Sequence, residues 1–322
     1  MTTHEHILEL RNRLAASVIG QQQVIDQLLI ALLANGHVLL EGLPGLAKTR
    51  TIKTLAANLE SDFSRIQFTP DLLPSDITGT EIYISEASTD KFQFQPGPVF
   101  GNLILADEIN RAPAKAQAAL LEAMEERQVT VAGTSHALPA LFLVLATQNP
   151  IEQEGTYPLP EAQLDRFLVQ IDVDYPTRAV ERDILIATTG AEEADSHQVF
   201  TAEGLLAAQN VVRRMPVGEK VMEAILDLVR ACRPGEPEGR DLADALSWGP
   251  GPRAAQALML TVRARALLQG RLAPSVEDVA ALAQACLTHR MALSFAARAR
   301  GDTLAGIISR VSTRVLGLEA AA

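Results

Sequence analysis

A short loop between an apolar segment and a helical pattern constrains the fold of this chain more than any other feature. The loop, GLPGLAKT from Gly42 to Thr49, directly follows the apolar segment His37–Glu41. Its glycines allow backbone N–H groups to turn toward an anion, and the positive N-terminal end of the following helix adds to that attraction. A strand, such a loop and a helix in succession predict a phosphate-binding loop at the edge of a parallel sheet.

The residue types in this loop suit the binding of a nucleotide. Lys48 is placed to reach the β- and γ-phosphates, and the Thr49 hydroxyl is a suitable ligand for Mg²⁺. The general pattern has glycine where this chain has Ala47, and the alternative is a plain glycine turn with a solvated lysine. We expect the following residues to contact the nucleotide: Gly42, Leu43, Pro44, Gly45, Leu46, Ala47, Lys48, Thr49 and Arg50.

The first half of the chain alternates between apolar segments and helical patterns. Five segments are typical of buried parallel strands: His37–Glu41, Ser64–Thr69, Leu103–Asp107, Leu141–Thr147 and Phe167–Val173. Three segments between or before them have helical periodicity: Gln21–Ala34, Lys48–Leu59 and Pro113–Arg127. This alternation predicts an α/β fold with a five-stranded parallel sheet flanked by helices. Residues 70–101, with four prolines, and residues 128–140, around Gly133, are expected to be an insert with a hairpin and a second hairpin.

After Pro176 the strand signal disappears and amphipathic helical patterns follow: Thr177–Thr189, Ala202–Arg213, Gly218–Cys232, Arg253–Leu268, Val276–Arg290 and Thr303–Leu316. Ser275 is a suitable N-cap for the helix that begins after it. The sequence therefore predicts an α/β core over residues 1–190, a polar linker over 191–198 and a small all-helical lid domain over 199–322.

Charge and composition exclude several classes of protein. The net charge of −11 belongs entirely to residues 1–175, which hold 11 basic and 22 acidic residues, whereas residues 176–322 hold 17 of each. This acidity argues against a broad nucleic-acid-binding surface on the first half. The apolar run Leu28–Ala34 is far shorter than the roughly 20 residues of a membrane span. Cys232 and Cys286, without an export signal, are expected to be buried thiols in a cytoplasmic protein.

Polar residues end or directly follow two of the predicted apolar strands. Asp107 and Glu108 close the segment LILADE, at the sheet edge where ligands of such folds bind. Asp107 would hold Mg²⁺ and its water, and Glu108 would polarise the attacking water as general base. Asn149 ends the segment LVLATQN and could orient that water toward the γ-phosphate. The alternative for Asn149 is a simple Asx-turn before Pro150.

These motifs, in this order, resemble those of AAA+ ATPases. Four sequence motifs closely resemble those of the MoxR family: GLPGLAKT, LADEINRAP, ATQNP and LPEAQLDRF. Ala47 agrees with that family. The resemblance implies an ATP hydrolase that uses ATP and Mg²⁺ and assembles into an ATP-bound ring, usually a hexamer. It also implies that Val18, Ile19 and Gly20 lie near the adenine.

The resemblance extends to three arginines. Arg166 in LDRF matches the family's arginine finger, which would reach the γ-phosphate held by the adjacent subunit. Arg253 in WGPGPR matches sensor 2, which couples the lid to the nucleotide, although the glycine- and proline-rich stretch before it departs from that of many relatives. Arg111 in DEINRAP is a further candidate for the subunit interface. A surface ion pair is the alternative for Arg166, and an ion pair with a nearby carboxylate for Arg111.

Family members remodel or activate protein complexes, often with a von Willebrand factor A domain protein. We therefore expect a chaperone-like ATPase with such a partner and a protein client, and without membrane insertion. Two alternatives are a nucleic-acid-associated motor, disfavoured by the acidic core, and a metal-chelatase-type ATPase subunit. A third is a scaffold that binds ATP and hardly hydrolyses it.

Overall fold

The structure, a computed structural model, describes residues 3–43, 46, 48–86, 89–149, 156–189 and 198–317. Pro44, Gly45 and Ala47 of the predicted loop and residues 191–197 of the predicted linker lie outside this set. Among the described residues, no helix combines the length and the apolar character that a membrane span requires.

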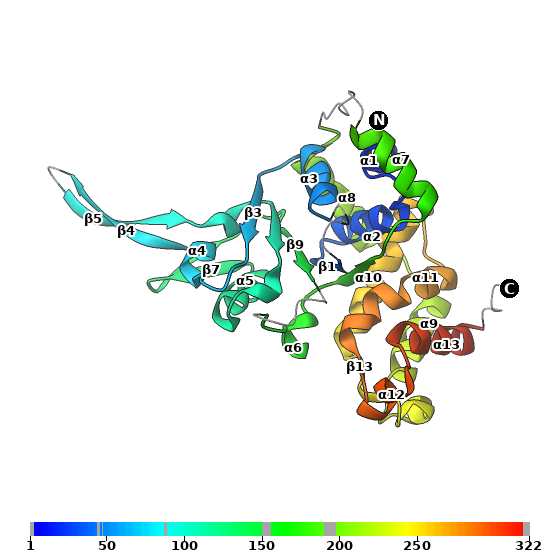
Figure 1. Cartoon of the computed structure of the whole chain (residues 1–322). Helices are drawn as coiled ribbons and strands as arrows, with labels where there is room; N and C mark the ends of the chain where they lie inside the picture. The colour runs from blue at the N-terminus through cyan, green and yellow to red at the C-terminus, as the bar shows by residue number, and fades with distance from the viewer. Residues whose placement is uncertain are drawn as a thin grey trace.

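A five-stranded parallel sheet forms the centre of the molecule, as the sequence predicts (Figure 1). Its order is β10–β1–β9–β6–β3, and its strands are β1 (Val38–Gly42), β3 (Phe63–Gln67), β6 (Leu103–Asp107), β9 (Leu143–Gln148) and β10 (Val169–Val173). Because all five strands are parallel, their carboxyl ends meet at one edge, which brings the loop after β1 beside Asp107 and Gln148.

Side chains alternate between the two faces of the sheet, and each face has its own hydrophobic core. Leu40 and Leu105 pack on one face, against α1 (Thr3–Ser17), α2 (Gln22–Leu33) and α3 (Lys48–Ala57). Leu39 and Ile104 pack on the other face, which α5 (Ala114–Glu126) covers. Helices therefore flank both faces, as expected for a doubly wound parallel sheet.

Two antiparallel hairpins extend from this core. β4 (Gly79–Glu86) and β5 (Thr89–Pro96) form a long arm that projects far from the sheet (Figure 1), after the short helix α4 (Pro74–Thr78). β7 (Gln128–Val131) and β8 (Thr134–Ala137) form the second hairpin. Phe94 and His136 stack with their ring centroids 3.9 Å apart and join the two hairpins. Both hairpins confirm the sequence prediction.

The chain after residue 200 is mainly helical, and we call its helices the lid: α8 (Ala202–Arg214), α9 (Glu219–Ala231), α10 (Pro252–Leu268), α11 (Val276–Leu287), α12 (Phe295–Arg300) and α13 (Leu304–Leu316). Ser275 caps α11 as predicted, with the Asp278 carboxylate accepting from the Ser275 backbone N–H at 2.8 Å. α11 ends at Leu287 and continues as a 3₁₀ turn over Thr288–Arg290, three residues earlier than predicted.

The lid also contains elements that the sequence does not predict. β12 (Leu246–Trp248) and β13 (Ala292–Leu293) pair antiparallel, and β11 (Phe200–Thr201) pairs with β2 (Leu59–Glu60). These strands are too short to produce a period-two pattern. α12 has only six residues, too few to establish a helical period.

The lid shares one hydrophobic core with the first face of the sheet. Buried residues of α1 and α2 belong to the same cluster as those of α8, α10 and α11. Gln209 in α8 donates to the backbone oxygen of Leu32 at 2.9 Å. Cys232 and Cys286 are free buried thiols within this region, as predicted. The domain limits at 190 and 199 stay a prediction.

Candidate active site

Lys48 begins α3 and lies at the carboxyl edge of the sheet. Its Nζ donates to the backbone oxygen of Gly42 and, at 3.3 Å, to that of Gln148. Burial lowers the pKa of Lys48, and the carboxylates of Asp107 and Glu108 partly oppose this. The ammonium group is therefore held between β1 and β9 by neutral carbonyl oxygens, which phosphate oxygens could replace as partners.

Gly42 ends β1 at a position where there is no room for a side chain. A Cβ there would lie 2.5 Å from the backbone oxygen of Val173 on β10. Of the other residues predicted to contact the nucleotide, Thr49 is half-buried in the first turn of α3, and Arg50 is exposed.

The turn predicted to lie near the adenine is placed beside this loop. Gln21 donates from Nε2 to the backbone oxygen of Leu46 at 3.1 Å, which joins the turn over 18–20 to the loop. Val18 is buried, and Gly20 has a φ of 77°, a left-handed conformation that favours glycine. A Cβ on Gly20 would also collide with the side chain of Val180 in α7 (Arg178–Thr189). The structure thus brings Val18, Ile19 and Gly20 next to the loop.

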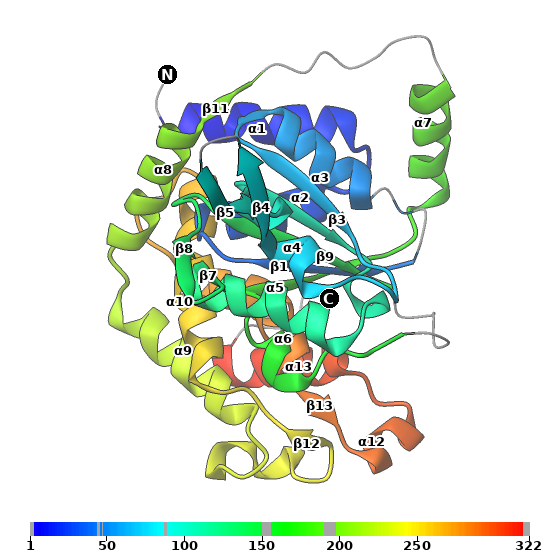
Figure 2. The same ribbon diagram turned by 90° about the vertical axis from the view of Figure 1, so that its left-hand side faces the viewer.

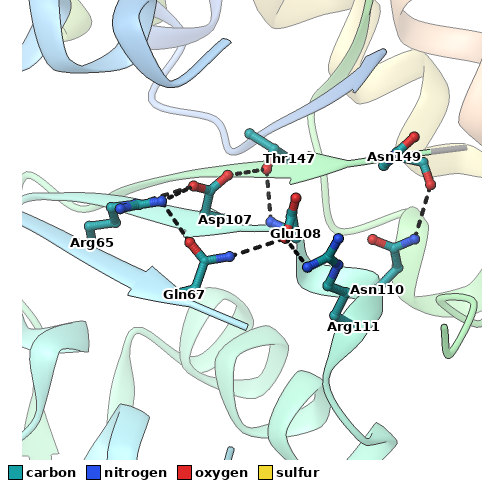
Figure 3. A network of polar contacts seen from close by, with 8 residues as sticks. All are labelled: Arg65, Gln67, Asp107, Glu108, Asn110, Arg111, Thr147 and Asn149. Atoms are coloured by element: carbon teal, nitrogen blue, oxygen red, sulfur yellow. Dashed lines mark hydrogen bonds and ion pairs between the residues drawn. The ribbon is translucent and has the colours of Figure 1, made fainter. Parts of the chain in front are cut away.

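Asp107 and Glu108 lie at the end of β6 within a network of polar contacts (Figure 3). Thr147 on β9 connects them: its hydroxyl donates to Asp107 Oδ1 at 2.7 Å and accepts from the Glu108 backbone N–H at 2.8 Å. Glu108 has φ 57° and ψ 51°, which is uncommon for a residue other than glycine, asparagine or aspartate. This conformation costs backbone energy, which the contacts around Glu108 have to offset.

Two residues of β3 hold the carboxylates of this network from the other side (Figure 3). Arg65 lies 2.6 Å from Asp107 Oδ2 and donates to Gln67 Oε1. Gln67 in turn donates to Glu108 Oε2 at 3.2 Å. Arg65, Gln67 and Thr147 are not among the residues predicted from the sequence. Their signal is the strand order: Gln67 is in register with Asp107 only because β3 pairs with β6.

Arg111 and Asn149 complete the site on the side of β9. Arg111 Nη1 lies 3.0 Å from Glu108 Oε2, the carboxylate pairing that was the alternative to an interface role. Asn149 is 4% exposed, and its backbone oxygen accepts from Asn110 Nδ2 at 3.2 Å. The structure therefore places Asn149 at the sheet edge that carries Glu108, and its role toward water stays a prediction.

The residues present fit a Mg²⁺ ion bound together with phosphates. Thr49 and Asp107 offer the hydroxyl and carboxylate oxygens that Mg²⁺ prefers, and it normally completes its shell with phosphate and water oxygens. Among the described residues, no group of three or more histidine, cysteine or acidic side chains could hold a metal ion alone.

Arg166 and Arg253 are brought together in a separate group, which we call the arginine cluster. Both pair with Glu125: Arg253 Nη2 at 2.5 Å from Oε1 and Arg166 Nε at 3.8 Å from Oε2. Glu125 is in the last turn of α5, about 16 Å along that helix from its first residue, Ala114. Since α5 begins just after the Glu108–Arg111 segment, the cluster lies well away from Lys48 of the same chain.

A buried arginine of the lid fixes the backbone around Arg166. Arg290, only 2% exposed, lies 2.6 Å from Asp165 Oδ1 and donates to the Phe167 backbone oxygen at 2.7 Å. His289 also contacts that oxygen at 3.0 Å. Arg166 stands between the two residues that Arg290 binds, so the lid positions it. Arg290 is not predicted from the sequence, because this contact spans more than 120 residues.

Comparison with known proteins identifies the two domains and several relatives. Residues 37–169 match the ATPase family associated with various cellular activities (AAA), and residues 240–310 match the AAA lid domain. The chain is 43% identical to Chaperone MoxR1 of Mycobacterium tuberculosis over 91% of this chain and 78% of that one. It is 32% identical to Protein MoxR of Paracoccus denitrificans over 94% and 93% of the two chains. A crystallised Cytophaga hutchinsonii protein, described as a candidate ATPase, is 41% identical with a TM-score of 0.87, covering 96% and 94%.

Proposed function

Because the chain belongs to the MoxR family of AAA+ ATPases, we propose that it hydrolyses ATP in a ring of identical subunits, most simply a hexamer. The cycle would drive remodelling or activation of a partner protein, with a von Willebrand factor A domain protein as the adaptor. One observation supports the ring above all others: Arg166 and Arg253 lie at the far end of α5 from Glu108. A complete site therefore needs a second subunit.

The residues at the sheet edge divide the chemistry of hydrolysis between them. Lys48 would exchange the carbonyl oxygens of Gly42 and Gln148 for the β- and γ-phosphates. Thr49 and Asp107 would hold Mg²⁺, which neutralises charge on the transferred phosphoryl group. Glu108 would accept a proton from the attacking water, and Asn149 would orient that water.

Glu108 has to leave its present partners before it can act as a base. Gln67 and Arg111 both contact its Oε2 atom. Both contacts occupy lone pairs of that oxygen, which a proton from the attacking water would need. We propose that nucleotide and neighbouring subunit together redirect Glu108 toward the water, which would link hydrolysis to assembly.

The arginine cluster would complete the site of the next subunit. Arg166 would stabilise charge on the γ-phosphate, as arginine fingers do in other nucleotide hydrolases. Arg253 stands at the start of a lid helix and would couple the same phosphate to the lid. Glu125 keeps both guanidinium groups together in the isolated subunit and would release them to the more highly charged nucleotide.

Turnover of ATP by the purified protein tests the first part of the proposal. We expect Lys48→Ala to abolish hydrolysis, while Lys53→Ala, an exposed lysine of the same helix, leaves it unchanged. Equal turnover in both variants would refute the assigned site. Turnover near 1 s⁻¹ would exclude a scaffold that only binds ATP, and stimulation by DNA that falls with salt would favour a nucleic-acid motor.

Capture of partners with Glu108→Gln tests the second part. This variant should bind ATP and hydrolyse it slowly, so that engaged partners stay bound. Enrichment of a von Willebrand factor A domain protein with ATP but not ADP would support remodelling. Equal recovery with both nucleotides would contradict it. The metal-chelatase alternative predicts a different partner set, and the cytoplasmic location stays a prediction.

A further inference from the structure

An apolar groove runs between α9 and α10 on the surface of the lid. It has a volume of about 490 Å³ and is lined by Met222, Ile225, Leu226, Ala255, Met259 and Leu260, together with Gln256. Leu226 is 47% exposed. Exposed apolar surface of this kind is typical of an interaction site, because its burial against a partner removes it from water.

The exposed side of α7 carries an apolar surface of matching kind. Leu185 and Ile186 are adjacent in the sequence and are 63% and 64% exposed. Arg178 and Arg182 precede them by one to two turns on the same side of the helix, and both are exposed. α7 therefore presents two basic residues followed by two large apolar ones.

α9 presents the opposite charge beside the groove. Glu219, Glu223 and Asp227 recur at every fourth residue and are all exposed. They lie on the side of the helix that carries the groove residues Met222 and Leu226, at i+3 positions. Within the described part of the chain, no ion pair involves Arg178, Arg182 or these three carboxylates. The two surfaces are thus complementary in charge as well as in apolar character.

The positions of the two surfaces suit contact between copies of the chain. α7 and the α9–α10 pair lie on opposite sides of the molecule (Figure 2). The two surfaces of one chain therefore cannot meet each other, but a head-to-tail arrangement of copies brings them together and can close into a ring.

Their spacing also agrees with the proposed nucleotide contacts. On α10, the groove residue Met259 lies about 9 Å along the helix from Arg253. On α7, Ile186 lies about 9 Å from Val180, which packs against Gly20 beside the phosphate-binding loop. Arg253 can therefore reach a neighbour's nucleotide while Met259 meets that neighbour's α7.

We propose that α7 of one subunit docks into the α9–α10 groove of the next. Ile186 and Leu185 fill the groove, and Arg178 and Arg182 pair with the acidic row on α9. This inference rests on the proposed ring, and it specifies which surfaces hold the ring together. Neither surface includes Lys48, Glu108 or Arg166.

Cysteine cross-linking between two different chains tests this contact. One chain carries Ile186→Cys and the other Met259→Cys; the native cysteines, Cys232 and Cys286, are buried. With ATP and mild oxidation, the mixture should form a disulfide-linked dimer of the two chains that neither variant forms alone. As matched control, Leu272→Cys, 88% exposed beyond the end of α10, should not link to Ile186→Cys.

Charge exchange gives a second and independent measurement. Arg182→Glu should raise the protein concentration needed for ring assembly at least tenfold, as should Glu223→Arg. The double variant, with both substitutions in one chain, should need a concentration for ring assembly within threefold of the original value. Both residues are exposed, so the unfolding temperature of each variant should stay unchanged.

The outcomes separate this inference from the proposed function. Rings that assemble and hydrolyse ATP without the 186–259 cross-link would overturn the docking contact and leave the proposed function in place. A protein that hydrolyses ATP as a monomer would overturn both the ring and the contact. Cross-linking together with charge rescue would support both.

Discussion

Two clusters in this molecule have the same composition, one carboxylate shared by two arginines, and differ in their surroundings. Glu125 binds Arg166 and Arg253 at the surface, where all three side chains are 29–45% exposed. Asp278 binds Arg265 and Arg271 with its own side chain fully buried. Burial alone would raise the pKa of Asp278, but hydrogen bonds from Arg271, the Ser275 backbone and Arg265 hold it below its usual range.

The comparison shows that environment, rather than residue type, decides what an arginine pair can do. The buried carboxylate cannot release its partners without leaving a charge unpaired in the interior. The exposed carboxylate can release them at little cost, because solvent takes their place. We therefore assign the buried Asp278 cluster to folding and the exposed Glu125 cluster to exchange with a neighbour's nucleotide.

The largest effect should come from the exposed cluster. Arg166→Ala should lower ATP turnover by roughly 10³-fold, the scale of an arginine finger, without changing nucleotide binding or stability. Mixed in equal amounts with Lys48→Ala, it should recover about a quarter of wild-type turnover, because one interface in four then has both groups intact. Arg310→Ala, on the exposed side of α13, is the control. Lack of recovery on mixing would place Arg166 in its own subunit's site.

The buried cluster should respond to substitution with lost stability. Asp278→Asn should lower the free energy of unfolding by about 3–5 kcal/mol, because two arginines lose a buried counter-charge. Turnover per folded molecule should stay the same. Urea denaturation measures the change, and Asp302→Asn, which breaks the surface pair with Arg300, should cost less than about 1 kcal/mol. Similar costs for both variants would contradict the distinction.

Mild acid should destabilise the fold through two histidines and not through Asp278. Burial lowers the pKa of His37 to about 3 and that of His289 well below its usual value. The unfolded chain then binds more protons than the folded one below pH 6.5, so stability falls as pH decreases through that value. From pH 7.5 to 5.5 each histidine should cost about 1.4 kcal/mol. Asp278, whose pKa is lowered, contributes stability above the unfolded pKa of about 3.9 and does not change in this range.

The smallest effect should follow from substitution of the exposed carboxylate, Glu125. Glu125→Gln should change the free energy of unfolding by less than about 1 kcal/mol, since it removes only surface ion pairs. ATP turnover should fall by less than about tenfold, because Arg166 and Arg253 remain, although an ion pair no longer holds their guanidinium groups together. A loss of stability as large as that of Asp278→Asn would show that the two clusters are equivalent.

The sequence predicts those parts of the site whose signals are local. Lys48, Asp107 and Glu108 each end or begin a periodic segment, so their positions at the sheet edge follow from the strand pattern. Arg65 and Gln67 could not be predicted, because only the order of strands places β3 beside β6. Arg290 binds Asp165 across 125 residues, and no local pattern reports such a contact.

The pairing of Glu125 with two arginines could not be predicted for the same reason. Arg166 and Arg253 each match a motif, but their common partner is in a helix 41 residues before one and 128 before the other. The sequence thus predicts both arginines and not that they stand together. That meeting depends on how the lid packs against the core.

Arg290 joins the lid directly to the segment that carries Arg166. The segment that carries Arg166 is bonded to Arg290 on both sides, so any displacement of the lid helices has to move that arginine. If Arg166 completes the adjacent subunit's site, a mechanical load on one lid alters the rate at which the next subunit consumes ATP. The rate of ATP hydrolysis in the ring would then depend on the force with which a protein client opposes movement of the lid, without a separate regulatory domain.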